Sequence, residues 1–168
     1  GDEYAANSVI ATAPSKSFNI AGLQVSNIFI ENKKLRDAFR NEIVKSGYSQ
    51  LNTMGLVAAR AAYEFGKEWL DEVRAYIKDN LIFFRDYLKE NIGELSLIEP
   101  EGTYLVWVDF GKLGLGEKQR EDLIVNKAKL WIDSGAMFGA DGEGFERFNI
   151  ACPRSYLKKA LDSLKKAV

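Results

Sequence analysis

The clearest pattern in the sequence is a series of apolar residues spaced three or four positions apart in the middle of the chain. This spacing places the apolar side chains on one face of a helix, because an α-helix has about 3.6 residues per turn. The pattern predicts a long amphipathic helix that ends near Gly93. Its apolar positions are Leu70, Val73, Ile77, Leu81, Phe84, Leu88 and Ile92.

Four shorter segments also carry helical patterning. Residues 32–46 place apolar side chains at helical spacing and are followed by Gly47, a residue type that commonly ends helices. Residues 55–65 are rich in alanine, which suits a closely packed helix. The other two predicted helices cover residues 120–134 and 155–167.

Short strands are predicted where β-branched and aromatic residues lie between turn-forming residues. Turn-forming residues follow the first strand at 14–17, and a glycine-rich loop at 135–144 precedes the last. Together, these elements predict an α/β or α+β fold in which helices pack on a small sheet. The five strand segments are 8–13, 25–30, 95–98, 103–110 and 145–151.

The composition is that of a globular protein with its own core, since 46% of the 168 residues are hydrophobic. The 23 Lys and Arg residues nearly balance the 24 Asp and Glu residues, which argues against nucleic acid or an anionic membrane as the main partner. No apolar run approaches the roughly 20 residues of a membrane span, and the chain does not start with a leader-like segment. With a single cysteine, Cys152, we expect a reducing, cytoplasmic location.

The sequence contains no histidine, which excludes Ser-His-Asp and Cys-His triads and imidazole zinc sites within this chain. A general base here has to be Lys, Asp, Glu, Tyr or Cys. Cys152 has no histidine to activate it, so a buried structural role is favoured over a nucleophilic one. No metal site is predicted, because the acidic loop 141–144 lacks the remaining ligands of a calcium loop.

Four residues remain as candidates for chemistry. Lys16 lies in a turn just after a predicted strand, and lysine forms Schiff bases with aldehydes, although spacing alone favours an ordinary loop lysine. Arg147 and Arg154 lie on the last predicted strand and just beyond it, where an arginine can bind a carboxylate or form a structural ion pair. Tyr104 can present its hydroxyl to a ligand, and the alternative is a packed strand residue.

Three segments, in order along the chain, resemble the fold-type I pyridoxal 5'-phosphate enzymes. Within the class I and II aminotransferases they are most similar to the MalY/PatB-like cystathionine β-lyase branch. The resemblance covers essentially the whole chain but only the C-terminal part of the family's sequence. The segments are residues 12–23 (TAPSKSFNIAGL), 100–110 (PEGTYLVWVDF) and 144–154 (GFERFNIACPR).

The resemblance implies roles for individual residues. Lys16 matches the lysine that binds the cofactor as a Schiff base and then moves the α-proton of the substrate as general base. Ser15 is implied to help hold the cofactor phosphate, and Gln24 stands where many relatives have a phosphate-binding arginine. Arg147 matches the arginine that binds the substrate α-carboxylate, and Tyr104 is implied to lie near the substrate. A supporting role is implied for the second arginine, Arg154.

The resemblance also implies a domain organisation. Residues 1–31 correspond to the tail of the large cofactor domain, residues 32–66 to connecting helices, and residues 67–168 to the C-terminal small domain of a transferase-like fold. The family's remaining cofactor contacts, an aromatic ring stacker, an Asp, an Asn and a Tyr, come from upstream segments that these residues do not include. We therefore expect this polypeptide alone to be inactive and the complete protein to be a homodimer.

The leading functional hypothesis is that the parent protein is a pyridoxal phosphate-dependent C–S lyase. It would β-eliminate cystathionine-like or cysteine substrates to a thiol, pyruvate and ammonia. An aminotransferase is the alternative among enzymes, because both reactions begin with removal of the α-proton. A third possibility is that the isolated chain acts only as a non-catalytic interaction module.

Overall fold

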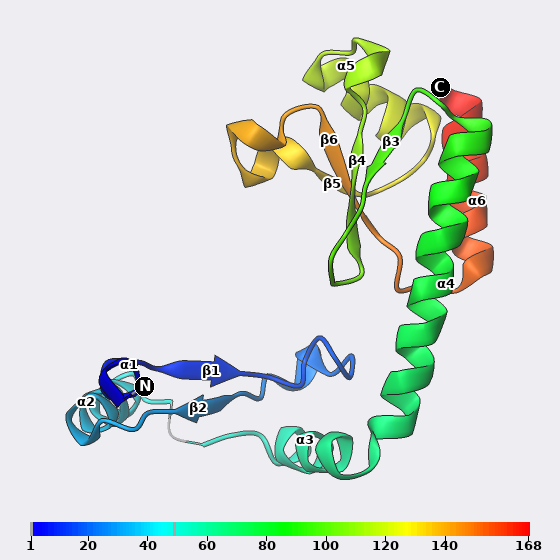
Figure 1. Ribbon diagram of the computed structural model, residues 1–168. Helices are drawn as coiled ribbons and strands as arrows, with labels where there is room; N and C mark the ends of the chain where they lie inside the picture. The colour runs from blue at the N-terminus through cyan, green and yellow to red at the C-terminus, as the bar shows by residue number, and fades with distance from the viewer. Residues whose placement is uncertain (1, 49) are drawn as a thin grey trace. The chain divides into compact units, whose positions relative to one another are not determined.

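The computed structural model describes residues 2–48 and 50–168. The chain divides into two compact units, Gly1–Glu72 (unit 1) and Val73–Val168 (unit 2). The long predicted helix is present as α4 (Lys67–Asn91), which contributes its first residues to unit 1 and the rest to unit 2 (Figure 1). Among the described residues, no helix combines the length and the apolar character needed to cross a membrane.

Unit 1 consists of short strands and helices. The two strands among its described residues form an antiparallel pair in which Ile10 lies opposite Phe29 and Thr12 opposite Asn27. Both strands are shorter than the predicted segments, and the first helix was not predicted from the sequence. The elements are α1 (Asp2–Ala6), β1 (Ile10–Thr12), the 3-10 turn η1 (Ala21–Leu23), β2 (Asn27–Phe29), α2 (Lys33–Lys45) and α3 (Thr53–Phe65).

The ends of α2 are set by local sequence. The side chain of Asn32 caps the first turn by accepting a hydrogen bond from the Lys34 backbone N–H at 2.9 Å. At the other end, Gly47 has a φ of +75° and its N–H donates to the Val44 carbonyl at 3.1 Å. Glycine adopts this left-handed backbone conformation at little energetic cost, which is why it often ends helices. The predicted helix end at Gly47 is therefore confirmed.

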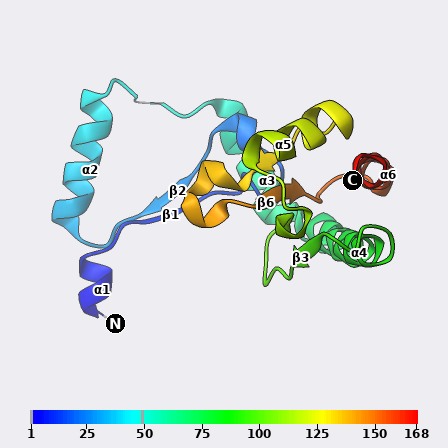
Figure 2. The ribbon, with the colours of Figure 1, turned by 90° about the horizontal axis from the view of Figure 1, so that it is seen from above.

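Unit 2 contains a four-stranded antiparallel sheet in the order β3-β4-β6-β5. The helices α4 and α6 run side by side along this sheet, as both Figure 1 and Figure 2 show. They are tied to each other by a 2.6 Å hydrogen bond from the Tyr87 hydroxyl to Asp162. The elements are β3 (Ser96–Ile98), β4 (Leu105–Asp109), α5 (Glu117–Glu121), the π-helical segment η3 (Asp122–Lys127), β5 (Asp133–Ser134), β6 (Phe145–Asn149) and α6 (Arg154–Ala167).

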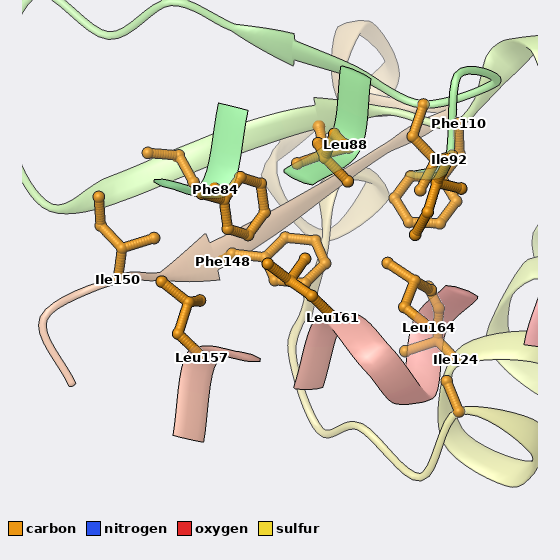
Figure 3. Packing of buried hydrophobic residues seen from close by; sticks show 14 of the residues in the cluster. Phe84, Leu88, Ile92, Phe110, Ile124, Phe148, Ile150, Leu157, Leu161 and Leu164 are labelled. Atoms are coloured by element: carbon orange, nitrogen blue, oxygen red, sulfur yellow. The ribbon is translucent and has the colours of Figure 1, made fainter. Parts of the chain in front are cut away.

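The core of unit 2 lies between this sheet and the two helices (Figure 3). Phe84 of α4 meets Phe148 of β6 edge to face, with ring centroids 5.2 Å apart. Along β4 and β6 burial alternates, so that every second side chain faces this core. The side chains between them, including Trp107 and Arg147, lie on the opposite face of the sheet. The resulting arrangement, helices packed on one face of a small sheet, confirms the predicted α+β architecture.

The predicted helix over residues 120–134 is wrong in its second half. Helical structure ends at Lys127, Lys129 has a φ of +56°, and the chain then extends into β5. Two hydrogen bonds close the end of the helix, from Ala128 N–H to the Leu123 carbonyl and from Leu130 N–H to the Ile124 carbonyl. Beyond this point Leu130 and Ile132 pack against the core while Trp131 between them is 91% exposed, the alternation expected of an extended chain.

Candidate functional site

Lys16 lies in a tight turn that follows β1. The turn is closed by hydrogen bonds from Phe18 N–H to the Pro14 carbonyl at 2.9 Å and from Ile20 N–H to the Ser15 carbonyl at 3.1 Å. Pro14 is buried, Ser15 is half-buried and Lys16 is exposed. The backbone that carries the lysine is therefore fixed while its amine remains accessible.

Phe18 anchors the lysine turn to the helices of unit 1. Its ring meets Tyr63 edge to face, with centroids 6.1 Å apart, and stacks on Trp69 at 6.3 Å. It also lies directly over Gly66, where an added Cβ would be 2.6 Å from the Phe18 ring. A glycine between α3 and α4 thus makes room for the ring that fixes the turn two residues after Lys16.

The segment after the turn is attached to the start of α3. The Asn52 side chain caps α3 by accepting a hydrogen bond from Gly55 N–H at 2.8 Å, and its amide donates to the Leu23 carbonyl at 2.6 Å. Gln24 follows in the left-handed region with a φ of +50°. The lysine segment is therefore held on both sides, by Phe18 and by Asn52.

Arg147 lies in a row of side chains that crosses three strands of unit 2. It is the register partner of Trp107 on β4 and of Asp133 on β5. Residues that face each other across neighbouring strands point to the same face of a sheet. All three side chains thus lie on the face opposite the core. Arg147 and Asp133 also contribute to a cleft of about 530 Å³ whose other walls come largely from residues 129–132 and from α6.

Two contacts hold the Arg147 guanidinium in place. Its Nη2 and Nε donate to the same oxygen of Asp133, Oδ2, at 2.5 Å and 3.1 Å. The guanidinium carbon lies 4.4 Å from the centroid of the Phe138 ring, a cation–π contact. Phe138 in turn meets Trp107 edge to face at 5.4 Å.

The glycine-rich loop 135–144 places Phe138 over the guanidinium. An added Cβ at Gly135 would be 2.1 Å from the Gly142 carbonyl oxygen, and one at Gly142 would be 2.1 Å from the Gly135 carbonyl oxygen. The backbone thus crosses itself at a distance that only two glycines permit. This crossing folds the loop back onto the sheet.

Arg154 has a structural role in joining the start of α6 to α4. Its Nε donates to Asn80 Oδ1 at 2.7 Å, and its guanidinium lies 4.5 Å from the centre of the Phe83 ring. The Asn80 amide donates to the carbonyls of Ile150 and Cys152, both at 2.8 Å. Asn80 is fully buried, so these bonds satisfy a polar group inside the core.

Tyr104 and Cys152 are both packed against the core cluster of unit 2. This position agrees with the packing alternative for Tyr104, and its contact with a substrate stays a prediction. Cys152 is half-buried rather than buried. Burial raises the pKa of the Cys152 thiol, against the opposing effect of a hydrogen bond from the Leu157 backbone. Its thiolate is disfavoured, as expected for a structural cysteine.

A buried ion pair lies on the core side of the sheet. Arg120 Nε donates to Glu146 Oε1 at 2.8 Å, and the two side chains are only 5% and 4% exposed. Burial raises the pKa of the Glu146 carboxyl, and the hydrogen bond and charge of Arg120 oppose that rise. The pair joins α5 to β6 and lies on the other face of the sheet from Arg147.

The structure places Lys16 and Ser15 in unit 1, and it places Arg147, on β6, and Tyr104, directly before β4, in unit 2. Sequence reasoning missed Asp133 and Phe138, the two partners of Arg147, because both contacts depend on how β5 and the glycine-rich loop meet β6. It also missed Asn80. A signal for Asn80 was present, since it lies three residues after Ile77 and four before Phe84 on the apolar face of the long helix.

Comparisons with known proteins agree on one family of relatives. The family model for aminotransferase class I and II matches residues 2–164. Cystathionine β-lyase PatB of Bacillus subtilis is 35% identical over 167 residues, which cover 99% of this chain and 43% of PatB. Protein MalY of Escherichia coli is 36% identical over 160 residues, which cover 95% of this chain and 41% of MalY.

The fold has close relatives among solved structures. Cystalysin from Treponema denticola, whose crystal structure contains pyridoxal 5'-phosphate, matches with a TM-score of 0.95 and 36% identity. The match covers 99% of this chain and 42% of cystalysin. This chain therefore spans less than half the length of the relatives it resembles.

Proposed function

Because the chain belongs to the aminotransferase class I and II family, we propose that it is the C-terminal portion of a pyridoxal phosphate-dependent C–S lyase. The substrates are cystathionine- or cysteine-type amino acids. The similarity to the cystathionine β-lyase PatB supports this class of reaction, and the similarity to cystalysin, which contains pyridoxal 5'-phosphate, supports the cofactor. The observation that carries the proposal is the exposed Lys16 on a turn that is fixed by Phe18 and Asn52.

The residues of the lysine turn fit the cofactor chemically. Lys16 offers an accessible amine for the cofactor aldehyde, and Ser15, one residue earlier, offers a hydroxyl for its phosphate. Gln24 is neutral, so it offers the cofactor phosphate hydrogen bonds rather than a positive charge. When bound, pyridoxal phosphate supplies an electron sink that stabilises the charge left at the substrate α-carbon after proton removal.

The chain's own residues then perform the remaining tasks. Arg147 binds the α-carboxylate and so orients the Cα–H bond of the substrate. The Lys16 amine takes the Cα proton, the Cβ–S bond breaks, and the sulfur leaves with the bonding electron pair and becomes a thiol on protonation. Hydrolysis of the remaining three-carbon fragment gives pyruvate and ammonia. Tyr104 is a further substrate contact in this proposal, as the family resemblance implies.

The test uses the longer polypeptide that carries this chain, loaded with pyridoxal phosphate. Borohydride reduction followed by peptide mass mapping is expected to place the pyridoxyl group on Lys16, and Lys16→Ala is expected to abolish both the modification and the activity. Pyruvate formation from cystathionine without a keto-acid acceptor supports the lyase. A cofactor that stays unattached to Lys16 contradicts the proposal.

An aminotransferase is the second candidate, favoured by the aminotransferase family model that matches almost the whole chain. In that reaction the same proton leaves the substrate, but the amino group is passed on to a keto acid. Strict dependence of product formation on an added keto acid therefore supports the aminotransferase and overturns the lyase. A cytoplasmic homodimer for the longer polypeptide, and inactivity of the 168-residue chain alone, are part of the same proposal.

A further inference from the structure

The Arg147 guanidinium is only partly satisfied by its partners. A guanidinium carries five N–H groups, and the Oδ2 oxygen of Asp133 accepts two of them, one from Nε and one from Nη2. Within residues 2–48 and 50–168, no other hydrogen bond from Arg147 is present. Both N–H groups of Nη1 and one of Nη2 are therefore free. These groups form the edge of the guanidinium that can bind a carboxylate through two parallel hydrogen bonds.

Two different contacts also restrict the motion of the guanidinium, one from Asp133 and one from Phe138. Asp133 fixes it within its own plane through Nε and Nη2. Its central carbon lies over the Phe138 ring, 4.4 Å from the centroid, and Trp107 on β4 contacts Phe138 in turn. An arginine side chain has several rotatable bonds, so these contacts remove freedom that a ligand would otherwise have to restrict.

The Arg147–Asp133 pair differs from another ion pair in the same unit. Arg85 and Glu99 form a pair in which each carboxylate oxygen accepts from a different nitrogen, at 3.0 Å and 2.5 Å. In the site, one oxygen of Asp133 accepts both bonds. Both acidic side chains are well exposed, at 45% for Asp133 and 60% for Glu99, so neither pair is expected to add much to stability.

We propose that Asp133 and Phe138 are positioning residues that hold Arg147 with its Nη1/Nη2 edge free for a substrate carboxylate. This inference rests on the proposed function, in which Arg147 binds the α-carboxylate. The Arg147 side chain is 24% exposed, so a ligand can reach it from solvent. The Asp133 charge partly offsets that of Arg147, so its benefit to binding is orientation rather than attraction.

Two substitutions separate orientation from charge. Asp133→Asn keeps an oxygen that accepts hydrogen bonds from Nε and Nη2 but removes the negative charge, so we expect carboxylate binding equal to or tighter than in the wild type. Asp133→Ala removes the acceptor, and we expect the dissociation constant to rise about tenfold, the upper end of what ordering one long side chain costs. Phe138→Leu, which removes the stacking ring but keeps apolar bulk, is expected to cost about threefold.

The experiment titrates the 168-residue chain, labelled with ¹⁵N at arginine, with acetate and follows the Arg147 side-chain resonances by NMR. Glu99→Ala is the matched control, because it removes a carboxylate from a similar exposed ion pair in the same unit. The proposal predicts weakened binding in Asp133→Ala, wild-type or tighter binding in Asp133→Asn, and no change in Glu99→Ala. The thermal unfolding midpoint of each variant reports whether it is folded.

Three results would overturn the proposal: Arg147 resonances that do not respond to acetate in the wild type, Asp133→Ala binding as the wild type does, or Asp133→Asn losing as much affinity as Asp133→Ala. The titration needs no cofactor, so it is independent of the lyase chemistry. If the longer polypeptide fails to attach pyridoxal phosphate to Lys16 while the acetate result holds, the proposed function falls and the positioning role stands. A parallel measurement of KM and kcat in an active protein is expected to show the Asp133→Ala effect mainly in KM.

Discussion

The two units of this chain contain many apolar residues but bury them to very different extents. In unit 2 the helices α4 and α6 and the sheet enclose a continuous core, and Phe84, Leu161 and Leu164 are all 0% exposed. Among the described residues of unit 1, the buried large or β-branched apolar side chains are those of Val25 and Ile30. Several of its large apolar side chains are exposed instead: Val44, Met54, Leu56, Val57, Tyr63 and Phe65.

This difference separates two ways of holding a functional residue. Arg147 lies on a sheet whose other face is packed against a hydrophobic core. Lys16 depends on a few specific contacts, mainly the Phe18 ring and the Asn52 amide, in a unit with little core. We therefore expect substitutions in unit 2 to change global stability, and substitutions in unit 1 to change the local order of the lysine turn.

The largest expected effect comes from opening the core of unit 2. Phe84→Ala removes a fully buried ring that contacts Phe148, so the free energy of unfolding is expected to fall by about 4 kcal/mol. Denaturant unfolding followed by circular dichroism measures it. Met54→Ala, at an exposed position of α3, is the control and is expected to stay within about 0.5 kcal/mol. Equal losses of unfolding free energy in the two variants would contradict the difference in core between unit 2 and unit 1.

The second-largest effect is expected from the hydrogen bonds of Asn80 inside the same core. Asn80→Ala leaves the Ile150 and Cys152 carbonyls and the Arg154 Nε without their partner, and we expect a loss of about 3 kcal/mol in unfolding free energy. The control is Asn126→Ala, which removes an exposed amide that donates to Asp122. A loss no larger than that of the control would show that the buried network adds little.

The glycine crossing in the loop of unit 2 gives a smaller effect. Gly135→Ala puts a Cβ 2.1 Å from the Gly142 carbonyl oxygen, so the loop has to shift at a cost of about 2 kcal/mol. We expect the Phe138 ring to leave the Arg147 guanidinium, which a change in the Arg147 NMR resonances would report. Gly93→Ala, where an added Cβ meets nothing within 4 Å, is the matched control. Unchanged Arg147 resonances would contradict the positioning role of the loop.

A corresponding glycine in unit 1 is expected to act locally. Gly66→Ala puts a Cβ 2.6 Å from the Phe18 ring and 2.4 Å from the Ala62 carbonyl oxygen. We expect the ring to be displaced and the opening free energy of the lysine turn to fall by about 1 kcal/mol. Faster hydrogen exchange at the Phe18 and Ile20 amides measures this change. Gly22→Ala, with open space around the added Cβ, is the control.

The smallest effect is a pH dependence in unit 2. Burial, the hydrogen bond to Asp162 and the charge of that carboxylate raise the pKa of Tyr87 to about 12 from its ordinary value near 10. A raised folded-state pKa favours the protonated form, so the contribution of Tyr87 to stability is fully present below pH 10 and is lost as the pH rises through 12. Absorbance of tyrosinate at increasing pH, compared with Tyr87→Phe, measures the titration. A Tyr87 that ionises near pH 10 would contradict this.

Local pattern predicted much of this fold from the sequence. Helical spacing from Leu70 to Ile92 and the glycine at 47 correctly predicted α4 and the end of α2. The same spacing failed beyond Lys127, because Lys129 takes a left-handed conformation and the chain then extends, with Leu130 and Ile132 packed against the core. Helical and strand periods are hard to separate in so short an apolar segment.

Of the candidate site, only the residues that lie in recognisable sequence motifs could be predicted. The segment around Lys16 and the strand around Arg147 indicated the family, and the match to the class I and II aminotransferase model confirms it. The partners of Arg147 were not predictable, because Asp133 is 14 residues away and reaches it only through the register of β5 and β6. The backbone crossing at Gly135 and Gly142 is likewise a tertiary contact that glycine content alone does not reveal.

The most direct test of the difference between the two units is hydrogen–deuterium exchange of the 168-residue chain, resolved by residue. We predict that the amides of β4 (Leu105–Asp109) and β6 (Phe145–Asn149) exchange only through global unfolding of unit 2. The amides of β1, β2 and the turn around Lys16 are predicted to exchange much faster, through local opening of unit 1. Equal protection of the two sets of amides would contradict the account.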